Sequence, residues 1–142
     1  MSELSLFLKS NKKERKNIKY AATKSLCDEN GKPLEWTIKP LTTKESEEIS
    51  EMCMKEAPVK GKPNVYRQQL DIRKFSLKAA AASVVEPNLY SAQLQDSYGV
   101  KTPEDLLLEL IDDPSEYTEF LSVINGQMEK EDIAQKRDEA KN

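Results

Sequence analysis

The sequence predicts an α+β protein that is predominantly helical, with an N-terminal β-hairpin packed on a bundle of about five helices. Three observations support this class. Polar and apolar residues alternate over residues 17–39, and a period of two is typical of half-buried strands. Apolar residues then recur at helical spacing through most of residues 42–126. Proline, glycine and N-cap residues divide this second part into separate helices.

The chain length of 142 residues fits a single domain that can bury a core of its own. We expect a flexible basic arm over residues 1–16, the hairpin over 17–39, a helical region over 42–126 and a charged tail over 127–142. The basic residues of the arm lack interleaved aromatic residues, so a solvated arm is favoured over a nucleic-acid site. The basic cluster consists of Lys9, Lys12, Lys13, Arg15, Lys16 and Lys19.

The predicted hairpin has one apolar face and a tight turn. Its connection contains an Asn-Gly pair, which readily adopts the positive φ angles of hairpin turns. A two-stranded sheet is marginal alone, so we expect its apolar face to rest on the helices. The single tryptophan is therefore interpreted as a core residue in preference to a ligand platform. The face comprises Ile18, Tyr20, Ala22, Leu34, Trp36 and Ile38.

Two long helices are predicted after the hairpin. Thr42 followed by Glu45 forms a capping box that starts a helix over residues 42–57, whose glutamate-rich face is favoured as solvated surface over a metal site. Residues 57–64 contain two prolines and a glycine and predict an exposed loop. Residues 65–85 predict one long helix, although the alternation of Leu70 and Ile72 keeps a strand open as the minor alternative.

The stretch from Val84 to Leu107, VVEPNLYSAQLQDSYGVKTPEDLL, predicts a corner between helices. Pro87 removes a backbone donor and ends the long helix. Ser91 can cap a short helix that Gly99 closes in the left-handed conformation. Thr102 with Pro103 starts the next helix, and Asp113 with Pro114 starts the last one in the same way.

Composition disfavours nucleic acid, export and disulfide chemistry. The 22 basic and 25 acidic residues are mixed along the chain and give a net charge of −3, which provides no field to hold a polyanion. The two cysteines, Cys27 and Cys53, fall outside any metal or redox spacing and on predicted apolar faces, where thiols are usually inert. Neither a secretory signal nor a bilayer-spanning stretch is recognisable, so we expect a cytoplasmic location.

Catalysis is also disfavoured. The chain has no histidine, and it lacks the nucleophile and phosphate-loop motifs of common enzymes. The carboxylate pair Asp112-Asp113 is explained by the turn before Pro114. We therefore expect no catalytic site, no cofactor and no metal, and the sequence by itself indicates an interaction domain.

Two segments in order carry a family resemblance. LEWTIKPLTTKE after a basic arm, followed by the run VVEPNLYSAQLQDSYGVKTPEDLL, resembles the XkdN-like phage tail assembly chaperone family over nearly the whole chain. The resemblance implies a non-catalytic protein of phage or prophage tail operons that binds the tape measure protein in the host cytoplasm and assists tail tube assembly. The tail tube protein is a further implied partner. The alternative is a structural tail component, such as a tail completion or baseplate-associated protein, that is retained in the virion.

The resemblance also implies a longer second product made by programmed translational frameshifting. Ala140-Lys141-Asn142 is compatible with a slippery A-rich codon string. Synonymous codons that interrupt this string would remove the expectation.

A chaperone for a long, helical partner needs exposed apolar side chains that can accept amphipathic helices. Three groups of residues are candidates, with core packing the favoured alternative for each of them. Self-association into a homo-oligomer stays open. The partner-binding candidates are Leu6, Phe7 and Leu8 near the N-terminus, Tyr90, Leu94 and Tyr98 in the corner, and Tyr117, Phe120 and Met128 near the end.

Overall fold

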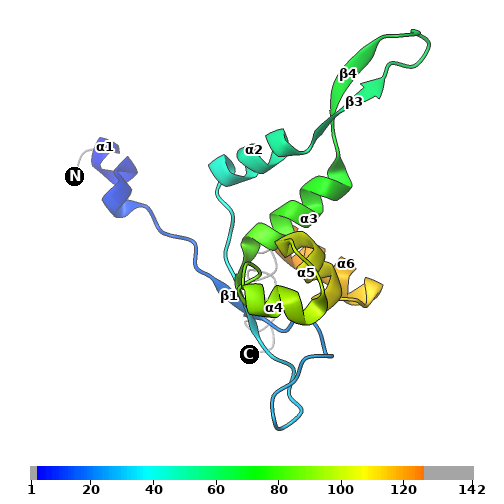
Figure 1. Ribbon diagram of the computed structural model, residues 1–142. Helices are drawn as coiled ribbons and strands as arrows, with labels where there is room; N and C mark the ends of the chain where they lie inside the picture. The colour runs from blue at the N-terminus through cyan, green and yellow to red at the C-terminus, as the bar shows by residue number, and fades with distance from the viewer. Residues whose placement is uncertain (1–2, 127–142) are drawn as a thin grey trace, which may run out of the picture.

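The computed structural model describes residues 3–126 and confirms an α+β fold in which helices dominate (Figure 1). The tail predicted for residues 127–142, including Met128 and the residues at 140–142, lies outside the described residues. The elements in chain order are α1 (Glu3–Phe7), the 3₁₀ turn η1 (Lys9–Asn11), β1 (Ile18–Tyr20), β2 (Trp36–Ile38), α2 (Thr43–Met52), β3 (Met54–Pro58), β4 (Tyr66–Leu70), α3 (Ile72–Ser83), β5 (Val84–Glu86), α4 (Ala92–Tyr98), α5 (Pro103–Leu110) and α6 (Pro114–Asn125).

The predicted N-terminal hairpin is present as β1 and β2, which pair antiparallel with Tyr20 opposite Trp36. Each strand has only three residues. The turn in the connection between β1 and β2 places Gly31 at a φ of +80°. A third strand, β5, pairs with the other edge of β2 and gives the sheet order β1-β2-β5. The prediction that residues 84–86 end the long helix is therefore wrong, because they form a strand. Their two valines suit a strand, and β2 supplies the backbone partners that a helix would otherwise supply.

Phe120 of α6 lies at the centre of the core. Its ring stacks on Tyr20 with centroids 6.2 Å apart and packs T-shaped against Trp36 with centroids 5.9 Å apart. The small sheet therefore rests on a helix through its apolar face, as a sheet of this size requires. Across the core, the small side chains of α3 let neighbouring helices approach its backbone closely. The buried cluster contains Ala22, Trp36, Ile38, Ala80, Ala81, Leu89, Leu106, Leu107, Leu110, Ile111 and Phe120.

The N-caps predicted for four helices and the stop predicted at Gly99 are confirmed. Thr42 and Glu45 form the reciprocal capping box of α2, and the hydrogen bond from the Thr42 backbone followed by that from Lys39 lowers the pKa of Glu45. Gly99 closes α4 with a φ of +68°, a value that few residues other than glycine adopt readily. The side chains that cap the N-termini of α4, α5 and α6 are Ser91, Thr102 and Asp113.

The two long helices predicted over residues 42–57 and 65–85 are shorter than expected. α2 ends at Met52, and residues 54–58 pair with residues 66–70 in an antiparallel hairpin, β3-β4. α3 begins only after Asp71, whose side chain caps it. The minor strand alternative, which rested on Leu70 and Ile72, was therefore correct for Leu70 at the end of β4 and wrong for Ile72 at the start of α3. Local helical spacing failed here because backbone pairing across the 59–65 connection, with Gly61 and Asn64 at positive φ, outweighs weak helix propensity.

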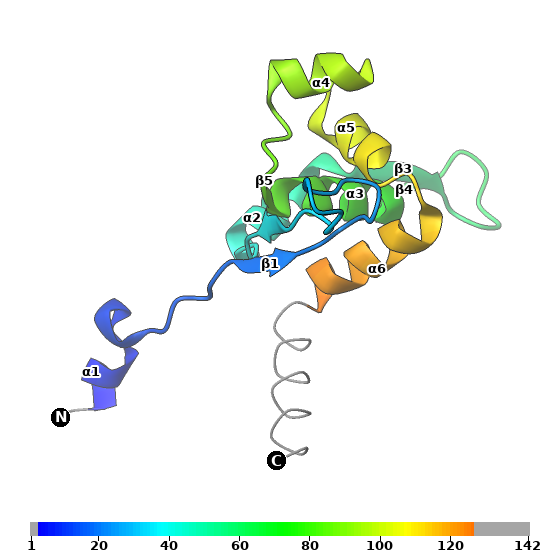
Figure 2. The same ribbon diagram turned by 90° about the horizontal axis from the view of Figure 1, so that it is seen from below.

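Two segments project from the body formed by the small sheet and α3–α6. In Figures 1 and 2, α1 stands apart from this body at the end of an extended connection, and Figure 1 shows β3-β4 reaching out beyond α2 and α3. Cys53, between α2 and β3, is buried as predicted. Cys27 is exposed, so it is not on a buried apolar face as predicted; it lies beyond β1, in an isolated antiparallel bridge with Pro33.

The buried sheet face makes alkaline stability depend on Tyr20. Burial, together with the nearby carboxylates of Glu119 and Glu116, raises the pKa of Tyr20 from about 10 to about 12. A raised folded-state pKa means that this stabilisation is complete below the unfolded pKa and is lost as the pH rises through the folded one. We expect Tyr20→Phe to make the fall in stability between about pH 10 and pH 12 shallower.

Urea unfolding across this pH range would measure the effect. Tyr90→Phe is the matched control, because Tyr90 is 74% exposed and outside the core. An equally shallow decline in both variants would contradict a specific role of Tyr20.

Candidate partner-binding surface

An apolar groove opens at the corner, where the loop between β1 and β2 meets β5, α4 and α5. We call it the corner groove. Its volume is about 340 Å³. It is lined by Leu26, Leu34, Glu35, Trp36, Glu86, Pro87, Leu94, Tyr98 and Leu110.

Local hydrogen bonds place α4 against the groove. The Ser91 hydroxyl accepts from the Leu94 backbone, and the Gln95 side-chain amide donates to the Leu89 carbonyl at 2.8 Å. Leu89 is itself 1% exposed and so anchors the chain just before the helix. Leu94 and Tyr98 are four residues apart on α4 and share one of its faces. The corner residues that the sequence singled out therefore hold two candidate side chains in the groove wall.

The groove has a buried floor and an open rim. Trp36 and Leu110 are almost fully buried, whereas Leu34 is 44% exposed, and Leu94 and Tyr98 are half-buried against the core. Water therefore reaches apolar surface that a partner side chain could cover.

The charges at the groove are acidic. Glu35 and Glu86 are the charged residues among those that line it, and both are exposed. Within residues 3–126, neither takes part in an ion pair. The groove therefore suits an apolar segment that carries basic residues beside its apolar side chains.

The structure divides the predicted partner-binding residues into exposed, partly buried and core positions. Leu6, Phe7 and Leu8 are 59%, 84% and 52% exposed on the arm, and Tyr90, in the connection before α4, is 74% exposed. Leu94 and Tyr98 line the groove itself. Tyr117 is half-buried against the core, Phe120 is completely buried, and Met128 lies outside the described residues. Core packing, the favoured alternative for every candidate, is therefore correct for Phe120 and wrong for the exposed side chains of Leu6, Phe7, Leu8 and Tyr90.

Sequence reasoning missed several groove residues. It assigned Leu34 and Trp36 to the buried face of a strand, and it treated Pro87 only as a helix stop. The available signal was the apolar alternation across Leu34 and Trp36. That signal shows which side chains share a face, but the groove exists because β5 pairs with β2 and brings Pro87 beside them.

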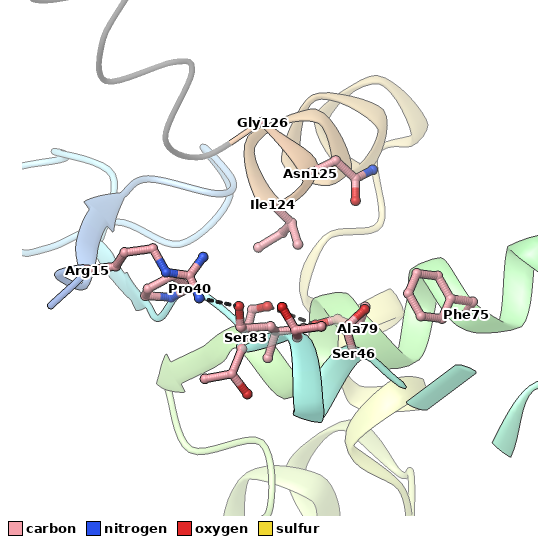
Figure 3. A pocket seen from close by; sticks show the side chains of 12 residues that line it. Arg15, Pro40, Ser46, Phe75, Ala79, Ser83, Ile124, Asn125 and Gly126 are labelled. Atoms are coloured by element: carbon pink, nitrogen blue, oxygen red, sulfur yellow. Dashed lines mark hydrogen bonds between the residues drawn. The ribbon is translucent and has the colours of Figure 1, made fainter. Parts of the chain in front are cut away.

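A second, more polar cleft of about 410 Å³ lies between the start of α2, α3 and the end of α6. Figure 3 shows Ile124 and Asn125 of α6 across this cleft from Arg15 and Ser83. The Arg15 guanidinium donates to the Leu41 carbonyl at 2.6 Å, and the Ser83 hydroxyl donates to the Ala79 carbonyl at 2.8 Å. Both polar groups therefore bind the protein's own backbone, and the hydrogen bond from Arg15 holds the base of the arm against the body.

Over residues 3–126, no group of three or more His, Cys, Asp or Glu residues is arranged to hold a metal ion. In the same part of the chain, no helix combines the length and apolarity needed to cross a membrane.

Comparison with known proteins points to phage tails. The family model described as "Phage XkdN-like tail assembly chaperone protein" matches residues 4–141. The phage-like element PBSX protein XkdN of Bacillus subtilis strain 168 is 27% identical over 143 aligned positions, covering 99% of this chain and 94% of that protein. The uncharacterised protein YqbN of the same strain is 24% identical over 127 positions, covering 87% and 84%.

A solved structure supports the fold. The crystal structure of the protein YqbN matches with a TM-score of 0.69 and 18% sequence identity, covering 86% of this chain and 92% of that chain. At this identity the likeness concerns the arrangement of the elements.

Proposed function

Because the chain belongs to the phage XkdN-like tail assembly chaperone family, we propose that it binds the tape measure protein in the host cytoplasm and assists assembly of the tail tube around it. It acts by binding, without a catalytic step. The tail tube protein is the second partner in this proposal.

The observation that supports the proposal is the corner groove. A long helical protein exposes an apolar seam until its final partners cover it, and such a seam aggregates readily. Helix-binding grooves accept apolar residues spaced along one face of an amphipathic helix. The corner groove offers half-buried Leu94 and Tyr98, exposed Leu34 and a floor formed by Trp36 and Leu110.

Co-expression with the tape measure protein tests this function. We expect the tape measure protein to be soluble with the wild-type chain, and Leu34→Asp to weaken its binding at least about tenfold by placing a charge in the groove. Leu108→Asp is a matched control. Leu108 is 41% exposed, close to the 44% of Leu34, and lies outside the groove.

Binding can be measured by pull-down and quantified on the purified complex, after circular dichroism has shown that both variants fold. A tape measure protein that is equally soluble without this chain would contradict the proposal. Mass spectrometry of purified tails separates the structural alternative, because abundant peptides of this chain in finished tails would favour a retained tail component.

A further inference from the structure

The N-terminal arm, residues 3–16, carries apolar surface that its own chain leaves exposed. α1 has five residues and none is buried. Leu4 and Phe7, three residues apart on one helical face, are 73% and 84% exposed. A helix this short is marginal in water unless it docks on another surface.

The arm and the corner groove are complementary in polarity and charge. The arm presents leucines and a phenylalanine and then a basic stretch that includes Lys9, Lys12 and Lys13. The groove is apolar inside, and its charged lining residues are Glu35 and Glu86. An apolar segment followed by lysines can therefore bury its side chains in the groove while the lysines approach the two carboxylates.

The arm leaves its own chain on the side away from this groove. Ile18 pairs with Ile38 and Tyr20 pairs with Trp36, so the chain enters β1 at the Ile38 end of the sheet, whereas the groove lies at the Trp36 end. The hydrogen bond from Arg15 to the Leu41 carbonyl holds the base of the arm at that entry end. In both Figure 1 and Figure 2, α1 lies well away from α4.

We propose that the arm of a second copy of this chain docks in the corner groove, and that two copies exchange arms in a closed, two-fold dimer. Such an exchange buries the apolar residues of the arm and the corner groove in both copies, through the same contact made twice. In the dimer, the arm covers the groove until a segment of the tape measure protein replaces it. Arm exchange and the proposed function use the same groove, but the dimer can be measured in the absence of the tape measure protein.

Sedimentation equilibrium of the full chain tests the dimer. We expect a concentration-dependent dimer whose dissociation constant rises at least about 100-fold in Phe7→Asp, because a charge replaces a buried aromatic anchor. Phe7 is 84% exposed in one chain, so its replacement should not unfold the protein. Ile72→Asp, at a 69% exposed position on α3, is the matched control and should leave the dimer intact.

Charge reversal tests the groove side. Glu35→Lys combined with Glu86→Lys should weaken the dimer, and adding Lys12→Glu and Lys13→Glu should restore it. A chain that stays monomeric at high concentration would overturn the inference. A dimer that Ile72→Asp breaks and Phe7→Asp does not, or a charge reversal without restoration, would overturn it as well.

Cross-linking separates exchange between copies from docking within one chain. Ser10→Cys places a thiol on the arm, and Cys27, adjacent to the groove residue Leu26, is the exposed native thiol of the described residues. A bismaleimide should join a Ser10→Cys chain that also carries Cys27→Ser to a chain of different mass that keeps Ser10 and Cys27 only when arm and groove come from different copies. A cross-link confined to single chains would refute the exchange. A monomer that still keeps the tape measure protein soluble would overturn the arm exchange and support the proposed function. A dimer that does not bind the tape measure protein would support the arm exchange and contradict the proposed function.

Discussion

Phe120→Ala is expected to lower the free energy of unfolding by about 3–5 kcal/mol, a large share of the stability of a domain of this size. The phenylalanine is 0% exposed and contacts the rings of Tyr20 and Trp36. Its removal takes away the buried ring and leaves a cavity between α6 and the sheet. Because the small sheet depends on this contact for its packing, we expect the sheet to lose order together with the core.

Urea denaturation followed by circular dichroism and tryptophan fluorescence would measure this loss. Tyr90→Ala removes an aromatic side chain that is 74% exposed, and it should change stability by no more than about 0.5 kcal/mol. A loss below about 1 kcal/mol in Phe120→Ala would show that the core repacks around the gap and that Phe120 is not its centre.

Glu116→Ala is expected to destabilise the protein by about 2–3 kcal/mol. One carboxylate oxygen of Glu116 accepts from the Thr23 hydroxyl at 2.8 Å, and the other accepts from the Lys24 backbone at 2.9 Å. Thr23 is 1% exposed, so the variant weakens the satisfaction of a buried hydroxyl and removes a charged acceptor from a backbone N–H. These bonds join α6 to the loop after β1.

A double-mutant cycle with Thr23→Val isolates this link. If the two side chains interact, the double variant should lose about 1–2 kcal/mol less than the sum of the two single losses. Glu109→Ala replaces an exposed glutamate on α5 and should lie within about 0.5 kcal/mol of the wild type. Additive losses in the cycle would argue that Glu116 acts on α6 alone.

The candidate site was only partly predictable from the sequence. Leu94 and Tyr98 were identified because aromatic and apolar residues in a turn-rich corner suggest a surface. The groove also needs Leu34, Pro87 and Leu110, which come from three other parts of the chain. Only the pairing of β5 with β2 and the packing of α5 bring these residues together. A local sequence pattern cannot predict contacts between residues so far apart in the chain.

The sequence by itself determined the features that depend on neighbours along the chain. The capping box at Thr42, the left-handed closure at Gly99 and the proline starts at Pro103 and Pro114 all involve residues within about four positions of each other. The first hairpin was also predictable, since its alternation and its Asn-Gly turn lie in one continuous stretch.

Only the tertiary structure decided which segments with ambiguous patterns became strands. Residues 54–58, 66–70 and 84–86 have sequences compatible with helix ends, and each became a strand because another backbone segment was available to pair with it. The burial of Phe120 and the link from Glu116 to Thr23, 93 positions away, likewise arise from contacts across the fold. Hydrogen bonds and burial between distant residues outweigh propensities of a few tenths of a kcal/mol per residue, which is why local patterns located the capped helices but not the groove.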